Sequence, residues 1–372
     1  MPLRVLVTGG AGFIGRRLVD RLVADGHSVV VLDSLVPQVH GESRPAVPAE
    51  TIWADVRDLD ALRTAMRGVD VVQHLAAETG VGQSQYEIAR YVGVNTFGTS
   101  AVLQSAIEAG ARQVVIASSR AVYGEGRHRC PRCHAVLSSA RRTVEAMDAG
   151  LFDLRCPTCG TVAVPEPTPE EASLAPTSIY GVTKVQQEEL ALAVAASHDL
   201  GVTVLRLFNV FGPGQSLKNP YVGVLGTFFR RIRGHRPVEL YEDGRMLRDF
   251  VFVDDVVEVF RAATGAEGAL GRTWNVGTGE AVTLEEMARA LGRALDDEPE
   301  LEVSGRYRLG DVRHAVADVS RLAEECGAVP STPLEKGLRA FVEWALGNEE
   351  DALDDLAEDQ LRSRHLLRQS SG

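Results

Sequence analysis

The chain has 372 residues, of which 45% are hydrophobic and 24% are charged, a composition typical of a globular protein. It is long enough for a full α/β domain and a smaller partner domain. A formal net charge of −12 argues against a general nucleic-acid surface, and no run of about 18 apolar residues predicts a membrane-spanning helix. The chain enters a predicted strand at once, without a signal-peptide pattern, so we expect a cytoplasmic protein without membrane contact.

Three glycines mark the first turn of the chain. The apolar run at 3–7 predicts a buried parallel strand, and apolar residues at helical spacing over 13–22 predict a helix after it. On such a strand-to-helix turn the first glycines allow backbone N–H groups to approach a pyrophosphate, and the last allows the helix to pack on the strand. The cofactor-binding residues predicted here are Gly9, Gly12, Phe13, Ile14 and Gly15.

A carboxylate follows the second predicted strand, which covers 28–32. Asp33 lies 18 residues after Gly15, near the spacing at which a carboxylate binds the adenosine ribose hydroxyls. Because a carboxylate at this place would repel a 2′-phosphate, the pattern favours NAD over NADP. The alternative is that Asp33 only caps a turn.

Strand and helix patterns then alternate, which predicts a doubly wound parallel sheet of the Rossmann type. Further strands are expected at 51–53, 69–73, 113–117 and 202–207, and helices at 59–67, 86–109 and 179–196. The segment 126–164 breaks the alternation and is expected to be an inserted module, with a short helix at 138–149.

These patterns predict an NAD-binding domain over 1–215, interrupted by the insertion, and a smaller substrate-binding domain over 216–348. Residues 249–277 are expected to return to the first domain, with a strand at 249–253 and a helix from about Asp254. The charged tail 349–372 carries leucines that permit a docked helix, although a frayed end is an equal alternative.

Two C-x-x-C pairs lie in the insertion. They are Cys130 with Cys133 and Cys156 with Cys159, and 22 residues separate the pairs. In a reducing compartment this spacing predicts a zinc-ribbon-like site with four thiolate ligands, rather than disulfides or a redox dithiol. Four thiolates fill a tetrahedral shell, so the predicted zinc is structural. Cys326 lies apart and is expected to be a small buried residue.

Tyr180 and Lys184 share one face of the predicted helix 179–196 because they are four residues apart. A nearby ammonium favours the phenolate, so the tyrosine is a candidate catalytic base. Ser119 lies at the end of the predicted strand 113–117, at the edge where open α/β sheets bind ligands, and can hydrogen-bond the reacting hydroxyl. The alternatives are a solvated Tyr–Lys pair and a serine that caps a turn.

With these motifs the chain resembles the extended short-chain dehydrogenase/reductases, the nucleotide-sugar epimerase/dehydratase family. The resemblance runs from residue 3 to about 344 outside the insertion, over the motifs at 8–15, 55–58, 74–77, 118–124, 180–184, 205–209, 248–254 and 275–279. It implies NAD as cofactor, a nucleotide-diphosphate sugar as substrate, and a homodimer formed through the helices 86–109 and 179–196.

The resemblance also assigns residues. It implies that Asp55 and Val56 flank the adenine, and that Leu75, Ala76, Ala77 and Asn95 line the cofactor together with Tyr180 and Lys184. The implied substrate-binding residues are Ser119, Arg120, Asn209, Arg248 and Arg308, with Arg313 as a further candidate for the same pocket. Arginine suits this role because its guanidinium binds phosphate through two hydrogen bonds, while a surface ion pair is the alternative for each arginine.

One departure from the family narrows the reaction. Dehydratases carry an Asp–Glu pair after the catalytic serine or threonine, and decarboxylating relatives keep the Glu, whereas this chain has Arg120 and Ala121. Elimination and decarboxylation are thus disfavoured, and C4 epimerisation by transient oxidation remains.

Segments 32–41, 78–84 and 118–124 are similar to bacterial dTDP-L-rhamnose 4-epimerases. The alternatives are a UDP-glucose or UDP-glucuronate 4-epimerase, a nucleotide-sugar reductase, and an NAD sensor with a zinc docking module.

Overall fold

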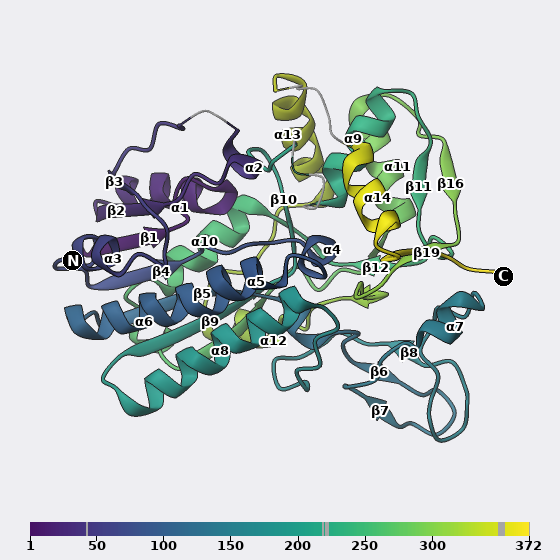
Figure 1. Ribbon diagram of the computed structural model, residues 1–372, viewed down its shortest axis with the longest axis horizontal. Helices are drawn as coiled ribbons and strands as arrows, with labels where there is room; N and C mark the ends of the chain where they lie inside the picture. The colour runs from purple at the N-terminus through teal and green to yellow at the C-terminus, as the bar shows by residue number, and fades with distance from the viewer. Residues whose placement is uncertain (42–43, 218, 220–222, 349–353, 372) are drawn as a thin grey trace.

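A parallel sheet forms the centre of the larger domain (Figure 1). In the computed structural model the described residues are 1–41, 44–217, 219, 223–348 and 354–371. The seven strands of the sheet lie in the order β14-β9-β5-β4-β1-β2-β3 and every neighbouring pair is parallel. Their bounds are β1 Arg4–Thr8, β2 Ser28–Asp33, β3 Glu50–Trp53, β4 Val71–His74, β5 Gln113–Ser119, β9 Gly201–Leu207 and β14 Arg272–Val276.

Helices cover both faces of this sheet, because successive side chains of a strand point to opposite sides. Val5 and Val7 of β1 pack toward α1 (Phe13–Ala24) and α10 (Val253–Ala263). Leu6 packs on the other side, in the apolar core shared with α3 (Leu59–Ala65), α6 (Gly98–Ala109) and α8 (Ile179–Ser197). The doubly wound α/β architecture expected from the sequence is confirmed.

The predicted helix 86–109 is interrupted. It consists of α5 (Ile88–Tyr91), a π-helical turn over Val92–Phe97 and then α6. A π turn adds one residue to the helical turn and is frequent at functional sites. Here Asn95 within it is fully buried. Short helices α2 (Pro37–His40) and α4 (Val81–Ser84) lie in the loops that follow β2 and β4.

The smaller domain has its own apolar core. Its helices are α9 (Val224–Arg233), α11 (Leu284–Leu295) and α13 (Leu334–Leu346). Its paired strands are β10 (Asn209–Phe211) with β13 (Phe250–Phe252), β11 (Val238–Leu240) with β16 (Leu301–Val303), and β12 (Leu247–Arg248) with β15 (Val282–Thr283) and β18 (His314–Ala315). Helix α12 (Ser320–Glu325) and the 3₁₀ turn at Glu267–Ala269 pack on the larger domain through Leu322 and Ala269, and the 3₁₀ turn at Arg120–Tyr123 follows β5. Strand β14 and helix α10 carry the chain back to the larger domain.

The insertion forms a small antiparallel sheet that extends from the body of the molecule (Figure 1). Its strands are β6 (His128–Arg129), β7 (Val136–Leu137) and β8 (Val164–Pro165). The helix expected at 138–149 is confined to α7 (Val144–Asp148), because the Thr143 side chain accepts a hydrogen bond from the Ala146 N–H and begins the helix there. Phe152 packs edge-on against Tyr307 of the smaller domain, with ring centroids 6.3 Å apart.

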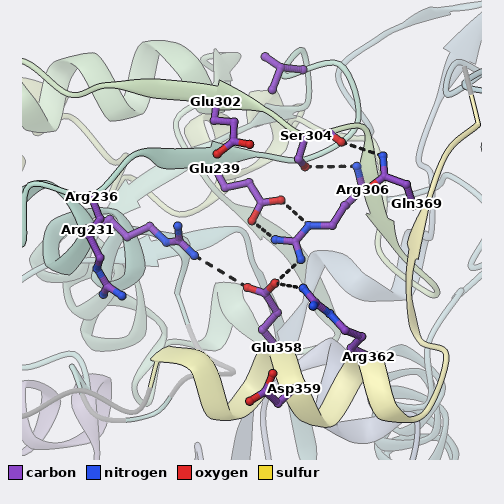
Figure 2. A pocket seen from close by; sticks show the side chains of 11 residues that line it. Arg231, Arg236, Glu239, Glu302, Ser304, Arg306, Glu358, Asp359, Arg362 and Gln369 are labelled. Atoms are coloured by element: carbon purple, nitrogen blue, oxygen red, sulfur yellow. Dashed lines mark hydrogen bonds and ion pairs between the residues drawn. The ribbon is translucent and has the colours of Figure 1, made fainter.

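The described part of the C-terminal tail is docked. Helix α14 (Asp354–Ser363) leads to β19 (Leu367–Gln369), which pairs antiparallel with β17 (Arg306–Arg308), and residues 349–353 and 372 of the predicted tail lie outside the described residues. Figure 2 shows a polar hollow beside this helix, in which Arg306 joins Glu239 and Glu358. Because these charges pair with one another, we interpret the hollow as the docking contact of the tail.

Candidate functional site

The glycine turn lies tightly against the loop after β4. Gly9 has φ +71°, and a Cβ there would meet the Ala76 nitrogen at 2.8 Å. A Cβ on Gly15 would meet the Gly9 carbonyl oxygen at 2.1 Å. Helix α1 begins at Phe13 after Gly12 without a side-chain cap, so the amides of its first turn, including Ile14, are available to an anion. This cradle fits the pyrophosphate of a dinucleotide.

Asp33 ends β2 directly beside that turn. Its buried carboxylate accepts hydrogen bonds from the Ala11 N–H at 3.0 Å and the Leu35 N–H at 2.9 Å. The carboxylate therefore caps its own turn and braces the glycine turn. Asp33 as a ribose ligand stays a prediction.

Asn95 ties the loop after β4 to helix α8. Its Oδ1 accepts from the Glu78 N–H at 2.8 Å, and its Nδ2 donates to the Glu78 carbonyl at 3.0 Å and to Thr183 Oγ1 at 3.0 Å. This loop carries Leu75, Ala76 and Ala77, all partly buried. Asn95 thus positions the loop that lies against the glycine turn.

The predicted adenine contacts follow β3. The Asp55 carboxylate is held by the Arg57 guanidinium through two bonds of 2.8 Å, and Arg57 keeps the pKa of Asp55 below its ordinary value. Val56 is buried against Gly98 at the start of α6. The structure places both residues at the carboxyl edge of the sheet, beyond β2.

The three predicted catalytic residues come from two adjacent elements. Ser119 ends β5, and helix α8 presents Tyr180 and Lys184 toward it. Ser178 caps α8 by accepting from the Gly181 N–H, and Ser84 Oγ accepts from the Tyr180 N–H at 3.1 Å. Lys184 Nζ donates to the Ala117 carbonyl at 2.8 Å and lies 5.8 Å from the Tyr180 ring centroid.

Burial and hydrogen bonding set the protonation of these groups. Burial raises the pKa of Tyr180, whereas a hydrogen bond with Ser119 and the positive charge of Arg120 act to lower it. Burial lowers the pKa of Lys184 to about 7, against the opposing effect of Glu188. The site therefore holds a phenol next to a serine hydroxyl and two basic groups, which is an arrangement suited to moving one proton.

We expect the substitution Lys184→Met to stabilise the fold at neutral pH. The Lys184 pKa of about 7 lies below the ordinary 10.5, so between these values the unfolded chain binds one more proton and wild-type stability rises with pH. The advantage of the variant should shrink toward pH 10, by up to about 1.4 kcal/mol per pH unit. Denaturant unfolding at pH 7 to 10 measures it, with the exposed Lys336→Met as control. A pH-independent difference would contradict the neutral lysine.

Arg120 follows Ser119 and is partly buried. Within the part of the chain that the structure describes, no hydrogen bond or ion pair engages its guanidinium. Burial and the charge of Arg248 lower its pKa to about 10, and Asp311 opposes this. A cation without a partner at this place is available to a ligand.

The arginines predicted for the diphosphate differ in their availability. Arg308 is exposed and lies over the Tyr241 ring at 4.7 Å. Arg248 is buried, and its guanidinium donates to the carbonyls of Leu247, Val312 and Arg313 and to the Asp311 carboxylate. The Nη1 and Nη2 groups of Arg248 already donate to the protein, which leaves its Nε–H for a ligand. The Oδ1 of Asn209 is buried without a partner among the described residues, as expected for a group that meets a ligand.

Arg313 does not have the free guanidinium expected of a phosphate ligand. It bonds Asp153, Glu242 and Asp243 at 2.5 to 2.9 Å and is 3% exposed. Its positive charge is balanced by three carboxylates, so the structure places it in a buried ionic network rather than in a phosphate-binding role.

Several residues that support the site were not identified from the sequence. Ser84 holds the start of α8, and Glu188 pairs with Arg206 at 2.7 Å and bonds Ser118 below the site. Their partners lie 18 to 96 residues away along the chain. The weak signal that was present is the helical spacing of Glu188 after Lys184.

The four paired cysteines converge. Their sulfur atoms all lie within 4.8 Å of one another, with Cys130–Cys159 at 3.4 Å and Cys133–Cys156 at 3.5 Å. Sulfurs placed about 2.3 Å from one ion at tetrahedral corners would be about 3.8 Å apart. Disulfide sulfurs would be about 2.05 Å apart. The donor set therefore fits a tetrahedral metal ion.

The fold and the serine–tyrosine–lysine group define a dinucleotide-dependent enzyme of the short-chain dehydrogenase type. The model of the NAD dependent epimerase/dehydratase family matches residues 5–140 and 136–277. The chain belongs to this family and is an NAD-dependent epimerase. None of the helices in the described part of the chain is long and apolar enough to cross a membrane.

Named relatives match over nearly their whole length. The chain is 37% identical to a dTDP-L-rhamnose 4-epimerase of Burkholderia thailandensis, over 92% of this chain and 94% of the relative. It is 33% identical to a UDP-glucose 4-epimerase of Mycolicibacterium smegmatis, over 92% and 98%. Among solved structures, MoeE5 in complex with UDP-glucuronic acid and NAD is 31% identical with a TM-score of 0.75, over 93% of this chain and 100% of MoeE5.

Proposed function

We propose that this protein is a nucleotide-sugar 4-epimerase that uses NAD and acts on dTDP-L-rhamnose. One observation carries the proposal. Ser119, Tyr180 and Lys184 meet at the carboxyl edge of the sheet beside the glycine turn, whereas the positions that follow Ser119 hold arginine and alanine. Without the carboxylates that elimination requires, this site favours reversible redox chemistry at one carbon.

Each side chain has a role in this reaction. Tyr180 removes the proton of the sugar C4 hydroxyl and later returns it, while Ser119 hydrogen-bonds the same oxygen. Lys184, held by the Ala117 carbonyl, favours the phenolate when it is protonated. Bound NAD would supply hydride transfer at C4, with the glycine turn and the first turn of α1 around its pyrophosphate.

The substrate within this class is argued from similarity. The relative named dTDP-L-rhamnose 4-epimerase is 37% identical over 92% of the chain, and the relative named UDP-glucose 4-epimerase is 33% identical over the same share. MoeE5 was solved with UDP-glucuronic acid. A UDP-glucose or UDP-glucuronate 4-epimerase is the second candidate, because the partnerless guanidinium of Arg120 would suit a sugar carboxylate.

The experiment is a substrate panel. Purified protein is incubated with dTDP-L-rhamnose, UDP-glucose, UDP-glucuronate and dTDP-glucose without added cofactor, and the products are identified by NMR. We expect the C4 epimer of dTDP-L-rhamnose without net NADH formation. Epimerisation of a UDP-sugar alone would support the second candidate. Loss of water or CO₂ would refute the interpretation of Arg120, and no reaction with any sugar would favour a reductase or a sensor.

We also propose that the four cysteines bind one structural zinc ion. Three pairs of sulfur atoms lie 3.4 to 3.9 Å apart and all four within 4.8 Å, which supports it, and Cys130 and Cys156 are buried in the small apolar core of the insertion. Four thiolates leave no open coordination position, so the ion would hold the insertion together and take no part in the reaction.

A homodimer is proposed from the surface of two neighbouring helical segments. Helices α6 and α8 lie side by side on one face of the molecule (Figure 1). Large apolar side chains are exposed on and next to them, including Phe97 at 53% and Leu192 at 45%. Such side chains mark interaction surfaces when they gather. Sedimentation equilibrium is expected to give twice the chain mass of 40.1 kDa, and a single-chain mass would refute this interface.

A further inference from the structure

A buried arginine connects the insertion to the rest of the molecule. Arg142 lies in the loop before α7, and its side chain is 3% exposed. Its Nε donates to Glu125 at 2.6 Å, and its Nη1 donates to Glu242 of the smaller domain at 2.5 Å. Both carboxylates are also almost fully buried. Charges buried this deeply are stable only in a well-defined geometry, so Arg142 is fixed in place.

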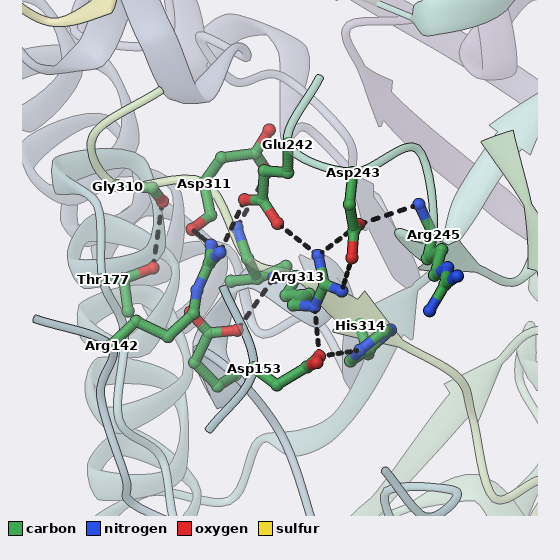
Figure 3. A network of polar contacts seen from close by, with 12 residues as sticks. Arg142, Asp153, Thr177, Glu242, Asp243, Arg245, Gly310, Asp311, Arg313 and His314 are labelled. Atoms are coloured by element: carbon green, nitrogen blue, oxygen red, sulfur yellow. Dashed lines mark hydrogen bonds and ion pairs between the residues drawn. The ribbon is translucent and has the colours of Figure 1, made fainter. Parts of the chain in front are cut away.

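The third contact of Arg142 reaches the substrate side. Its Nη2 donates to the Asp311 carbonyl oxygen at 3.0 Å. The Asp311 carboxylate accepts from Arg248 at 3.3 Å, and Arg248 also donates to the Val312 carbonyl at 2.8 Å. The turn at 311 is therefore held from one side by Arg142 of the insertion, as Figure 3 shows, and from the other by Arg248, a predicted substrate residue.

A second link from the insertion reaches the same segment. Asp153 accepts from Arg313 Nε at 2.5 Å (Figure 3). The Arg313 backbone N–H donates to Glu125 at 2.8 Å. Thr177, three residues before Tyr180, donates to the Gly310 carbonyl at 3.0 Å. Residues 310–313, which we call the clamp segment, thus join the insertion, the start of the catalytic helix and Arg248.

The Asp311 carboxylate of the clamp segment also interacts electrostatically with Arg120. Although burial opposes it, the charges of Arg248 and Arg120 keep the pKa of Asp311 below its ordinary value. The positive charge of Arg120 in turn acts to lower the pKa of the Tyr180 phenol. A shift of the Asp311 carboxylate would change the electrostatic environment of Arg248 and Arg120, which are both predicted to bind the substrate.

We propose that the insertion is a positioning element for the nucleotide-sugar pocket, in which Arg142 and Asp153 fix the clamp segment and, through Asp311, orient Arg248. Arg142 and Asp153 are positioning residues, because neither contacts a group assigned to the reaction. This inference rests on the proposed function for its substrate. It gives the insertion a role in substrate affinity that a passive surface module would not have.

The test compares two arginine substitutions within the insertion. Arg142→Gln removes the contacts to the clamp segment, whereas Arg132→Gln removes an equal charge from an exposed position between Cys130 and Cys133. For Arg142→Gln we expect KM for the nucleotide sugar to rise about tenfold, with kcat within about threefold and the NAD content unchanged. Arg132→Gln should match the wild type in all three quantities.

Asp153→Asn provides a second reading if Arg142→Gln does not fold, because Asp153 is 42% exposed and its isosteric replacement is milder. A rise in KM of about threefold is expected. If a folded variant loses thermal stability but keeps the wild-type KM, the insertion only stabilises the fold and the proposal is wrong.

Calorimetric titration with dTDP and UDP distinguishes a failure of this proposal from a failure of the proposed function. If the wild type binds a nucleotide but converts none of the four sugars, the proposed substrate fails while the variants still report on the clamp segment through Kd. If the wild type binds neither nucleotide, both proposals are overturned.

Discussion

Replacing Tyr180 with phenylalanine is expected to lower kcat by at least about a thousandfold while the protein keeps its bound NAD. The phenol hydroxyl bonds Ser119 and is the one group on α8 placed to take a proton from the substrate oxygen. Lys184 is not placed to substitute for it, because its Nζ is held by the Ala117 carbonyl. Turnover of the substrate found in the panel and the absorbance of the extracted cofactor measure the two quantities.

Tyr91→Phe is the matched control. The Tyr91 ring lies 6.5 Å from the Tyr180 ring, edge-on, and its hydroxyl donates to the Thr79 carbonyl. Burial raises the pKa of Tyr91, and its hydroxyl lacks the Ser119 and Arg120 neighbours that act to lower the pKa of Tyr180, so we do not expect it to serve as a base. This control should retain activity within a few fold. A Tyr180→Phe enzyme with near wild-type kcat would exclude the phenol as the base. A water molecule or a different side chain would then be the candidate base.

Local geometry defines the residues that were easiest to predict from the sequence. Gly15 is required by its contact with the Gly9 carbonyl within one strand-to-helix turn and Gly9 by its positive φ, so the turn can be recognised without its distant partners. Tyr180 and Lys184 share a helix face by spacing alone. Short-range rules are sufficient for such groups, because the neighbours that define them are a few residues away.

Residues that act through distant partners could not be assigned in this way. Arg142 contacts carboxylates 17 and 100 residues away, and no periodic pattern marks such a set. Arg248 and Arg313 carry the same side chain and are neighbours in the fold, but the first donates mainly to backbone carbonyls and the second to three carboxylates. Whether an arginine is free for phosphate depends on these partners, which only the fold brings together.

The interruption of the helix predicted at 86–109 has a similar origin. Its apolar periodicity is nearly continuous, yet the π-helical turn over Val92–Phe97 turns Asn95 inward to bond Glu78 and Thr183. A buried amide with three satisfied bonds compensates for the irregular turn. Periodicity reports the average face of a helix and is insensitive to one inserted residue.

The second large effect is expected from Cys133→Ser. Removing one of four thiolates should abolish stoichiometric zinc and lower the thermal midpoint by at least about 5 °C, because metal binding and folding of so small a module are coupled. The apolar core of the insertion contains few side chains beyond Leu137, Leu154 and Ala163, so the ion would replace much of the missing burial. Metal analysis and calorimetry measure the two effects.

Cys326→Ser is the control, because Cys326 lies outside the cluster and its pKa is raised by burial. It should keep one zinc per chain. Full metal content in Cys133→Ser, or none in the wild type, would refute the four-thiolate site, and iron in place of zinc would keep the site and correct the metal. If the insertion also positions the clamp segment, Cys133→Ser should raise KM in parallel with Arg142→Gln, since both changes would release the clamp segment. A loss of zinc that leaves KM unchanged would mean that Arg142 and its carboxylates hold the clamp segment without help from the metal.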